Sequence, residues 1–266
     1  MRRTKWMTAG AVAALLCVLA LPVLAGGFGL QYVSEDELAA EQAQGDWDFP
    51  LSYESLTGSD YLVLANRDSL LDKGYKPEDL VKIKARKVSS DAIQMRKAAS
   101  EAMSEMFDAA LEDGIKLYAS SGYRSYQTQN TMYHNRLKKN GGVDDKVVAY
   151  PGSSDHQTGL GIDIINYAGI GKRFTSAFAD TKEGKWLAEN CWDYGFILRY
   201  AKDKEDITQI IYEPWHFRYV GLEPAIYMRD NNLCLEEFTA QWHDAVTEFD
   251  GTEFVSVSVE DMEEAK

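Results

Sequence analysis

Apolar and polar positions divide the chain into four stretches of different character. Residues 8–25 are almost wholly apolar, residues 31–56 are polar and acidic, residues 57–248 carry periodic apolar positions, and residues 249–266 are acidic with few apolar side chains. A chain of 266 residues is long enough for one packed domain plus appendages. We therefore expect a targeting segment over 1–30, a linker over 31–56, one globular domain over 57–248 and a loose acidic tail over 249–266.

Helical periodicity is clearest between Ser89 and Gly114, where alanine and methionine recur at helical spacing. Ser89 or Ser90 is the expected N-cap of this helix, and Gly114 its end. Further helices are predicted over 125–140 with Ser125 as the N-cap, over 182–194, and from Glu223 and Leu235 onward. Strand-like runs occur at 60–65, 115–119, 160–165, 196–199, 210–212 and 217–220. Helices and strands are mixed without regular alternation, which favours an α+β fold over a doubly wound sheet.

The N-terminal segment has the layout of a targeting sequence. Arg2, Arg3 and Lys5 precede the apolar run, and the triplet Val-Leu-Ala that ends at Ala25 is an acceptable cleavage site. The apolar run continues to Leu30, which makes it long enough to span a bilayer if it is not removed. A cleaved signal peptide and a membrane anchor therefore both remain open. In either case the preceding positive charges place the rest of the chain outside the cytoplasmic membrane.

The net charge of −14 argues against a nucleic-acid partner, because such proteins need a basic face. It also argues against broad electrostatic attraction to anionic membranes or cell-wall polymers. Any anionic group of a substrate must then be held by a local cation.

Of the three cysteines, Cys17 lies in the apolar run, which leaves Cys191 and Cys234. A secreted location permits a disulfide between them. Neither lies in an obvious loop framework, so we favour two separate buried thiols.

The stretch SSDHQTGLGID (residues 153–163) is the first candidate for chemistry. It separates His156 and Asp163 by seven residues, with Gly159 and Gly161 between them. An extended run of seven residues would hold the two side chains roughly 23 Å apart and a helix roughly 10 Å apart. Zinc–ligand bonds are only about 2.0–2.2 Å long. If both side chains bind one metal, the chain must double back, which the glycines permit. The alternative is a hydrogen-bonded pair in a loop.

A second stretch, Glu213-Pro-Trp-His216, offers another carboxylate and another imidazole. The two stretches together supply enough groups for three zinc ligands and a general base. The chain has only four histidines. The other two, His134 and His243, lie in helix-like segments and are interpreted as surface or boundary residues.

Arg124 follows a predicted buried strand and a Gly-Tyr turn, a position where functional loops are common. Its planar guanidinium can pair bidentately with a carboxylate. Gln129 lies five residues further on, in the first turns of the next predicted helix. The alternative for Arg124 is a structural salt bridge with one of the many carboxylates.

Four motifs carry a resemblance to a known family: SGYRSYQTQ (121–129), SSDHQTGLGIDI (153–164), GFILRY (195–200) and IIYEPWHFRYVG (210–221). They resemble the zinc D-alanyl-D-alanine carboxypeptidases, the family of vancomycin-resistance carboxypeptidases and L,D-carboxypeptidases that trim peptidoglycan stems. The similarity extends from about residue 61 to about residue 238. It implies an α+β fold around a small central antiparallel sheet with flanking helices, shared with the hedgehog signalling domain.

The resemblance also implies roles for individual residues. One zinc ion per chain would be bound by His156, Asp163 and His216, with Glu213 as the catalytic base. Arg124, Gln129 and Ser154 would contact the terminal part of a peptidoglycan stem peptide.

Three positions depart from the family pattern. Asp155 stands where a glutamate is usual, Gly161 where an alanine is usual, and Gln209 where a glycine is usual. The first two keep charge and small size. Gln209 precedes the predicted strand that leads to Glu213, so we expect it to reshape the substrate rim.

These residue types suit a zinc peptidase. Three protein ligands leave a fourth zinc position open for water, whose pKa falls to about 7, and Glu213 can accept the water's proton. The function implied is removal of the C-terminal D-alanine from peptidoglycan stem peptides, by D,D- or L,D-cleavage. Two alternatives remain: a D-Ala-D-Ala dipeptidase, and a non-catalytic module of the same fold that binds wall peptides.

Overall fold

The structure of the chain is a computed structural model, and it describes residues 47–58, 60–89 and 92–264. These residues belong to one compact unit, Ala43–Lys266. The expected targeting segment over 1–30 and the first part of the expected linker lie outside the described residues. No helix in the described part of the chain is long and apolar enough to cross a membrane.

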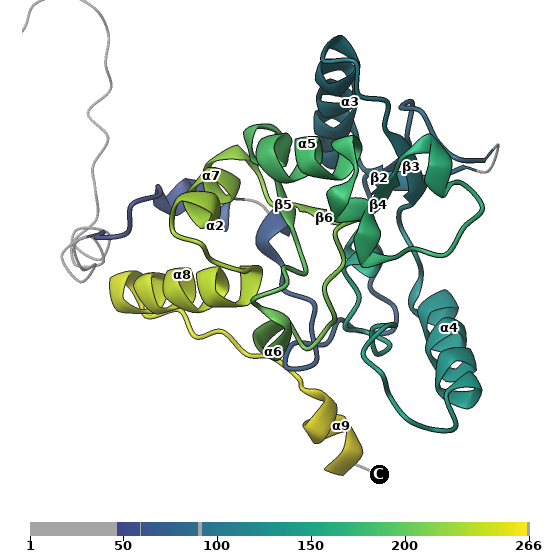
Figure 1. The fold of residues 1–266 in the computed structure, drawn as a ribbon. Coiled ribbons are helices and arrows are strands. Elements are labelled where there is room, and N and C mark those ends of the chain that lie inside the picture. Colours follow the sequence, from purple (N-terminus) through teal and green to yellow (C-terminus); the bar gives the residue numbers. More distant parts are fainter. Residues whose placement is uncertain (1–46, 59, 90–91, 265–266) are drawn as a thin grey trace, which may run out of the picture. The chain divides into compact units, whose positions relative to one another are not determined.

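Short strands and longer helices follow one another along the chain (Figure 1). In order they are α2 (Tyr53–Thr57), η1 (Asp60–Leu62), β1 (Leu80–Lys82), β2 (Gln94–Arg96), α3 (Lys97–Glu112), β3 (Tyr118–Ser121), α4 (Tyr126–Lys139), η2 (Asp155–Thr158), β4 (Gly161–Ile165), η3 (Tyr167–Gly169), η4 (Ser176–Asp180), α5 (Lys182–Asn190), η5 (Cys191–Tyr194), β5 (Phe196–Leu198), α6 (Glu205–Thr208), β6 (His216–Tyr219), α7 (Leu222–Asp230), α8 (Leu235–Asp250) and α9 (Val259–Glu264). The η elements are 3-10 helices.

A four-stranded antiparallel sheet in the order β3-β4-β6-β5 lies at the centre. A second sheet pairs β1 with β2. All five residues of β4 are buried, as expected for a central strand covered on both faces. This confirms the expected α+β fold with a small antiparallel sheet.

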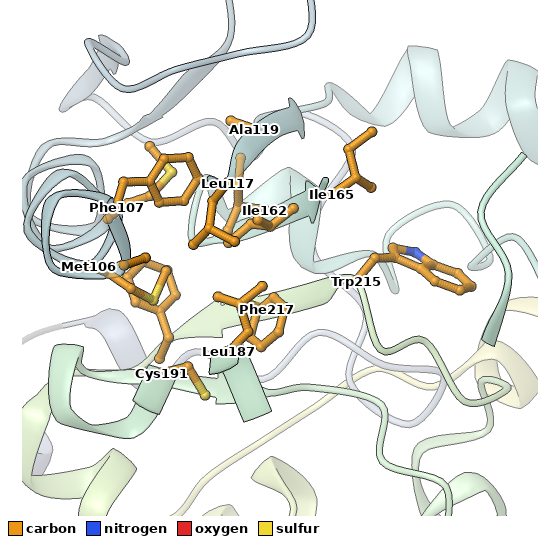
Figure 2. Close-up of a cluster of buried hydrophobic side chains, with 14 of the residues drawn as sticks. Met106, Phe107, Leu117, Ala119, Ile162, Ile165, Leu187, Cys191, Trp215 and Phe217 are labelled. Carbon is orange, nitrogen blue, oxygen red and sulfur yellow. The ribbon is translucent and has the colours of Figure 1, made fainter. Parts of the chain in front are cut away.

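One face of the sheet packs against α3 and α5 to form the main hydrophobic core. Figure 2 shows Met106 and Phe107 of α3 close to Ile162 of β4 and Phe217 of β6. Ile162 is paired directly with Phe217 across the two strands. Because side chains alternate along a strand, the neighbours Asp163 and His216 point to the opposite face of the sheet. Packing of Ile162 and Phe217 in the core therefore places Asp163 and His216 together on the opposite face of the sheet.

Several predicted elements are found where the sequence indicated them. Ser125 caps α4 by accepting a hydrogen bond from the backbone N–H of Thr128 (3.3 Å). α5 and the 3-10 helix η5 together cover 182–194, and Gly195 ends them in the left-handed conformation with φ 73°. The strands predicted at 160–165, 196–199 and 217–220 correspond to β4, β5 and β6.

Three local predictions were wrong because tertiary contacts override local pattern. The helix expected from Ser89 begins only at Lys97, since 94–96 pair with β1 as strand β2. The run 60–65 is not a strand; the carbonyls of Tyr61 and Val63 accept hydrogen bonds from Arg218 instead. The run 210–212 is not a strand either, and precedes a turn at Glu213.

The described end of the expected linker and the acidic tail both contact the domain. Trp47 packs edge-on against Tyr53 and against Phe249 of α8 (5.5 and 5.3 Å between ring centroids). In the tail, Val257 accepts a backbone hydrogen bond from Leu70 and Val259 donates one to Arg67. The tail is therefore attached to the domain over these residues, unlike the loose tail that we expected.

Cys191 and Cys234 are both buried and free. Burial raises the pKa of both thiols, that of Cys234 to about 12, so neither is a reactive thiolate at neutral pH. The preference for two separate thiols is confirmed.

Candidate active site

The structure brings His156, Asp163 and His216 together in a buried cluster, with potential ligand atoms all within 4.8 Å of one another. Asp163 on β4 is the direct cross-strand partner of His216 on β6. Nε2 of His156 lies 3.4 Å from Oδ2 of Asp163, and Nδ1 of His216 lies 3.0 Å from Oδ1. Two ligands bound tetrahedrally to one zinc ion are about 3.3–3.6 Å apart. The His156–Asp163 distance lies in this range and the His216–Asp163 distance is a few tenths of an ångström shorter, so a small adjustment of these side chains would accommodate a zinc ion.

Both imidazole rings present a definite nitrogen to this cluster. Nδ1 of His156 donates to the carbonyl of Gly122 (2.8 Å), which leaves Nε2 as the lone-pair nitrogen facing Asp163. Burial, reinforced by the positive charge of Arg124, lowers the pKa of His156, so its ring stays neutral. Nε2 of His216 is buried without a hydrogen-bond partner in the described part of the chain. Two imidazoles and a carboxylate are donors that zinc prefers.

The chain doubles back between His156 and Asp163, as the spacing required. His156 lies in η2, which Gly159 ends in the left-handed conformation with φ 70°. A side chain at Gly159 would also approach Leu80 and Arg96 to 2.8 and 3.1 Å, so this turn requires glycine. β4 begins two residues later and returns the chain past His156 to Asp163.

Glu213 enters the same site through a turn. The backbone N–H of His216 donates to the carbonyl of Glu213 (3.0 Å), and Pro214 occupies the second position, which proline favours in such turns. The turn brings the side chains of Glu213 and His216 to one cavity at the start of β6. Burial raises the pKa of Glu213 well above its usual range, and repulsion from Asp163 adds to this shift while Arg124 opposes it. A carboxylate with a raised pKa is well suited to accept and return a proton at neutral pH.

Arg124 is held by neutral partners. It donates to the side-chain oxygen of Gln129 (2.7 Å) and to the hydroxyl of Ser121 (3.1 Å). Gln129 is fixed in turn by donating to the carbonyl of Ala149 (2.7 Å). Among residues 47–58, 60–89 and 92–264, no carboxylate forms an ion pair with Arg124, so the structural salt bridge considered from the sequence is not found. A guanidinium has five N–H donors, which leaves donors for a ligand.

A cavity of about 260 Å³ joins all seven residues that the sequence singled out: Arg124, Gln129, Ser154, His156, Asp163, Glu213 and His216. Its wall also contains residues that the sequence did not indicate. They are Met132, Val147, Val148, Ala149, Arg173, Phe174, Tyr200, Ile210, Ile211 and Trp215. Met132 comes from α4 and the others from connecting segments, and most of them are apolar, so the sequence gave no chemical signal for them.

Behind the cavity, Asp155 pairs with two arginines that the sequence analysis also missed. Nε of Arg199 lies 2.7 Å from one carboxylate oxygen of Asp155, and Arg218 pairs with the other oxygen. All three side chains are fully buried. A charged residue inside an apolar strand run, such as Arg218 between Phe217 and Tyr219, was the available signal, because a buried charge requires a partner.

Gln209, which we expected to affect the substrate rim, is not among the residues that line the cavity. Gln209 ends α6 in the left-handed conformation with φ 58°. Glycine adopts this conformation at no steric cost, which explains why glycine is usual at this position in the family that the chain resembles. Its side chain points to Asp68 and donates to that carboxylate (3.0 Å). The residues that follow it, Ile210 and Ile211, line the cavity instead.

Comparison with known proteins agrees with this geometry. The family described as VanY, D-alanyl-D-alanine carboxypeptidase, matches residues 92–222. YodJ of Bacillus subtilis (strain 168) is 45% identical over 181 residues, which cover 66% of this chain and 66% of YodJ. D-alanyl-D-alanine carboxypeptidases of Enterococcus faecium and Enterococcus faecalis (strain ATCC 700802 / V583) are 36% and 33% identical. The alignments cover 71% and 77% of this chain, and 54% and 71% of those relatives.

Solved structures show the same fold. The LdcB LD-carboxypeptidase is 43% identical with a TM-score of 0.64, over 68% of this chain and 86% of LdcB. A vancomycin resistance D,D-pentapeptidase VanY in complex with Zn(II) is 32% identical with a TM-score of 0.56, over 67% of this chain and 98% of that structure. The chain belongs to the VanY D-alanyl-D-alanine carboxypeptidase family.

Proposed function

We propose that the chain is a zinc-dependent carboxypeptidase that removes the C-terminal D-alanine from peptidoglycan stem peptides. The observation that carries the proposal is one cavity containing a zinc-compatible donor set, a carboxylate with a raised pKa and an arginine without an ion-pair partner in the described chain. A VanY structure in complex with Zn(II) supports the choice of metal.

His156, Asp163 and His216 would hold one zinc ion. Zinc in such a three-ligand site supplies a Lewis acid that polarises a carbonyl and makes a water nucleophilic near neutral pH. Glu213 accepts the proton of the attacking water and delivers it to the leaving amine, which its raised pKa favours. Arg124, held in place by Gln129, binds the terminal carboxylate of the peptide and so fixes which bond reaches the metal. Ser154, buried in the same wall, contacts the terminal residue.

The substrate class rests on the relatives. Two of them are named D-alanyl-D-alanine carboxypeptidases, and LdcB is named an LD-carboxypeptidase that recognises peptidoglycan. The proposed reaction is therefore loss of one D-alanine from a stem peptide, whether the preceding residue has the D or the L configuration. Such a substrate lies in the cell envelope, which agrees with residues 1–30 as a signal peptide or membrane anchor.

A dipeptidase is the second candidate, and the cavity argues against it. A dipeptidase needs an acidic group to hold the free ammonium of its substrate. Among the described residues that line the cavity, the only carboxylates are Asp163 and Glu213, which the proposal already assigns to the metal and to proton transfer.

Three synthetic substrates test the proposal: a stem tetrapeptide ending in one D-alanine, a stem pentapeptide ending in D-Ala-D-Ala, and free D-Ala-D-Ala. Mass spectrometry of the products should show loss of a single alanine from the tetrapeptide, the pentapeptide or both. Cleavage of the free dipeptide alone would identify a dipeptidase. Binding of a stem peptide without cleavage by the zinc-loaded chain would identify a non-catalytic module.

A further inference from the structure

A continuous line of buried charges runs from the candidate metal site to helix α8. Asp155 accepts from Arg199 on one carboxylate oxygen and pairs with Arg218 on the other. Arg199 extends away from the metal site to Glu236, donating from Nη1 and Nη2 to the two carboxylate oxygens (2.8 and 2.6 Å). The side chain of Glu236 is only 10% exposed. The line of charges ends at Glu236 on α8. This helix lies C-terminal to residues 92–222, the part of the chain that matches the family.

The charges along this line balance. Two guanidinium groups face two carboxylates. Arg218 also donates from Nη2 to the carbonyls of Tyr61 and Val63 (2.9 and 2.7 Å) and from Nε to the carbonyl of Tyr219 (3.0 Å). Such an arrangement is expensive to bury and contributes little net stability compared with apolar packing. Its geometry is nevertheless rigid, because the Arg199–Glu236 pair is bidentate and Asp155 is held from two sides. The surrounding charges therefore hold the Asp155 carboxylate in a fixed position.

The carboxylate of Asp155 faces the far side of a candidate metal ligand. His216 presents Nδ1 to Asp163, and its Nε2 is buried without a partner in the described part of the chain. Oδ2 of Asp155 lies 3.9 Å from this Nε2. A neutral imidazole that offers the Nδ1 lone pair to a metal carries its proton on Nε2. Asp155 places a negative charge beside that N–H, at a distance too long for a direct hydrogen bond but short enough for electrostatic attraction.

We infer that Asp155 is a positioning residue whose negative charge, 3.9 Å from Nε2 of His216, favours the proton on that nitrogen, and that Arg199, Arg218 and Glu236 hold Asp155 in place for this electrostatic contact. The contact fixes the tautomer and the ring orientation of His216 and makes its Nδ1 a better ligand. Helix α8 thus supports metal binding through Glu236, although it contributes no residue to the cavity. This inference rests on the proposed zinc site and extends it to residues that touch neither metal nor substrate.

The test is the zinc affinity of the full chain, measured by competition with a chelator, together with the thermal unfolding of the zinc-free protein. Asp155→Asn keeps the shape but loses the charge, and should weaken zinc binding by about 10- to 100-fold. Asp155→Glu restores a carboxylate and should recover most of that loss. Glu236→Gln, one step further from the metal, should weaken zinc binding by about 3- to 10-fold.

Two matched variants separate this role from a general loss of stability. Glu237→Gln removes the neighbouring carboxylate on α8, which pairs with Lys204 (2.9 Å). Asp79→Asn breaks another arginine–carboxylate contact, with Arg96 (2.8 Å). Both variants are expected to unfold at lower temperature yet bind zinc as wild type does.

Wild-type zinc affinity in folded Asp155→Asn and Glu236→Gln would overturn the inference while leaving the zinc site itself intact. If Asp155→Asn does not fold, Glu236→Gln measured against Glu237→Gln decides alone. Equal zinc affinity in those two variants would then refute the inference. A wild-type chain that binds no zinc would instead refute the proposed function.

Discussion

If Arg124 binds the C-terminal carboxylate of the substrate, the enzyme is specific for the end of a peptide. This role can be tested by changing both partners of the interaction, the arginine and the carboxylate. The perturbations are Arg124→Ala in the protein and amidation of the C-terminal carboxylate in the substrate. Arg124 points into the cavity from the loop after β3, fixed by Gln129 and Ser121. Its neutral partners leave the positive charge uncompensated by any ion pair in the described chain, so a substrate carboxylate is the partner we expect.

The expected effect of these changes on kcat/KM follows from the environment of the Arg124 guanidinium. Hydrogen bonds to charged groups contribute about 1.5–3 kcal/mol, which corresponds to about a ten- to hundred-fold change in rate or binding. Burial lowers the pKa of Arg124, while Asp163 and Glu213 oppose that shift, and arginine remains charged at neutral pH. We therefore expect amidation to lower the kcat/KM of the wild type by about ten- to a hundred-fold.

The assay is a double-mutant cycle of kcat/KM, with free-acid and amidated stem peptides on wild type and Arg124→Ala. The variant should be slow on the free acid and nearly indifferent to amidation, since the two changes remove the same interaction. Arg136→Ala, which removes an arginine of α4 paired with Asp145, is the control and should retain the wild-type preference. An Arg124→Ala variant that still preferred the free acid as strongly as wild type would refute this role. Equal wild-type rates on both peptides would indicate an endopeptidase.

Three further outcomes are expected. His216→Ala should abolish zinc binding and activity, and metal analysis that finds one zinc per chain in this variant would contradict the ligand assignment. Glu213→Gln should retain zinc but lose about 10²–10⁴-fold in kcat, because an amide cannot accept the proton; near-normal turnover would show that the base lies elsewhere. Burial lowers the pKa of His243 to about 4 from its ordinary 6.5, so the neutral form is favoured in the folded chain. The resulting stability is fully present above pH 6.5 and is lost as the pH falls from 6.5 to about 4, by on the order of 1 kcal/mol after allowance for solvent. Urea unfolding at pH 7.5 and pH 5 should show a smaller difference in His243→Gln than in wild type, and an unchanged difference would count against this account.

Residues whose role depends on local geometry could be recognised from the sequence. Gly159 between His156 and Asp163 indicated that the chain doubles back, and its φ of 70° is the conformation that such a turn requires. Ser125 indicated the start of α4 because capping involves only neighbouring residues.

Features that depend on distant partners could not be recognised in the same way. The segment 94–96 fits a helical period, yet it pairs with a strand that ends twelve residues earlier, at Lys82. Arg199 and Arg218 meet Asp155 only because β4, β5 and β6 are adjacent in the sheet. Glu236 reaches Arg199 from a helix 37 residues further along the chain. No spacing rule links these residues, so only the folded structure reveals the line of charges.

The central claim is that one zinc ion, held by His156, Asp163 and His216, is required for removal of a terminal D-alanine. Its most direct test is a titration of the metal-free chain with zinc, in which D-alanine release from a stem peptide is followed as zinc is added. We expect no release without metal, a linear rise in rate as zinc is added, and saturation at one zinc per chain. Undiminished release by the metal-free chain, or saturation at a different stoichiometry, would contradict it.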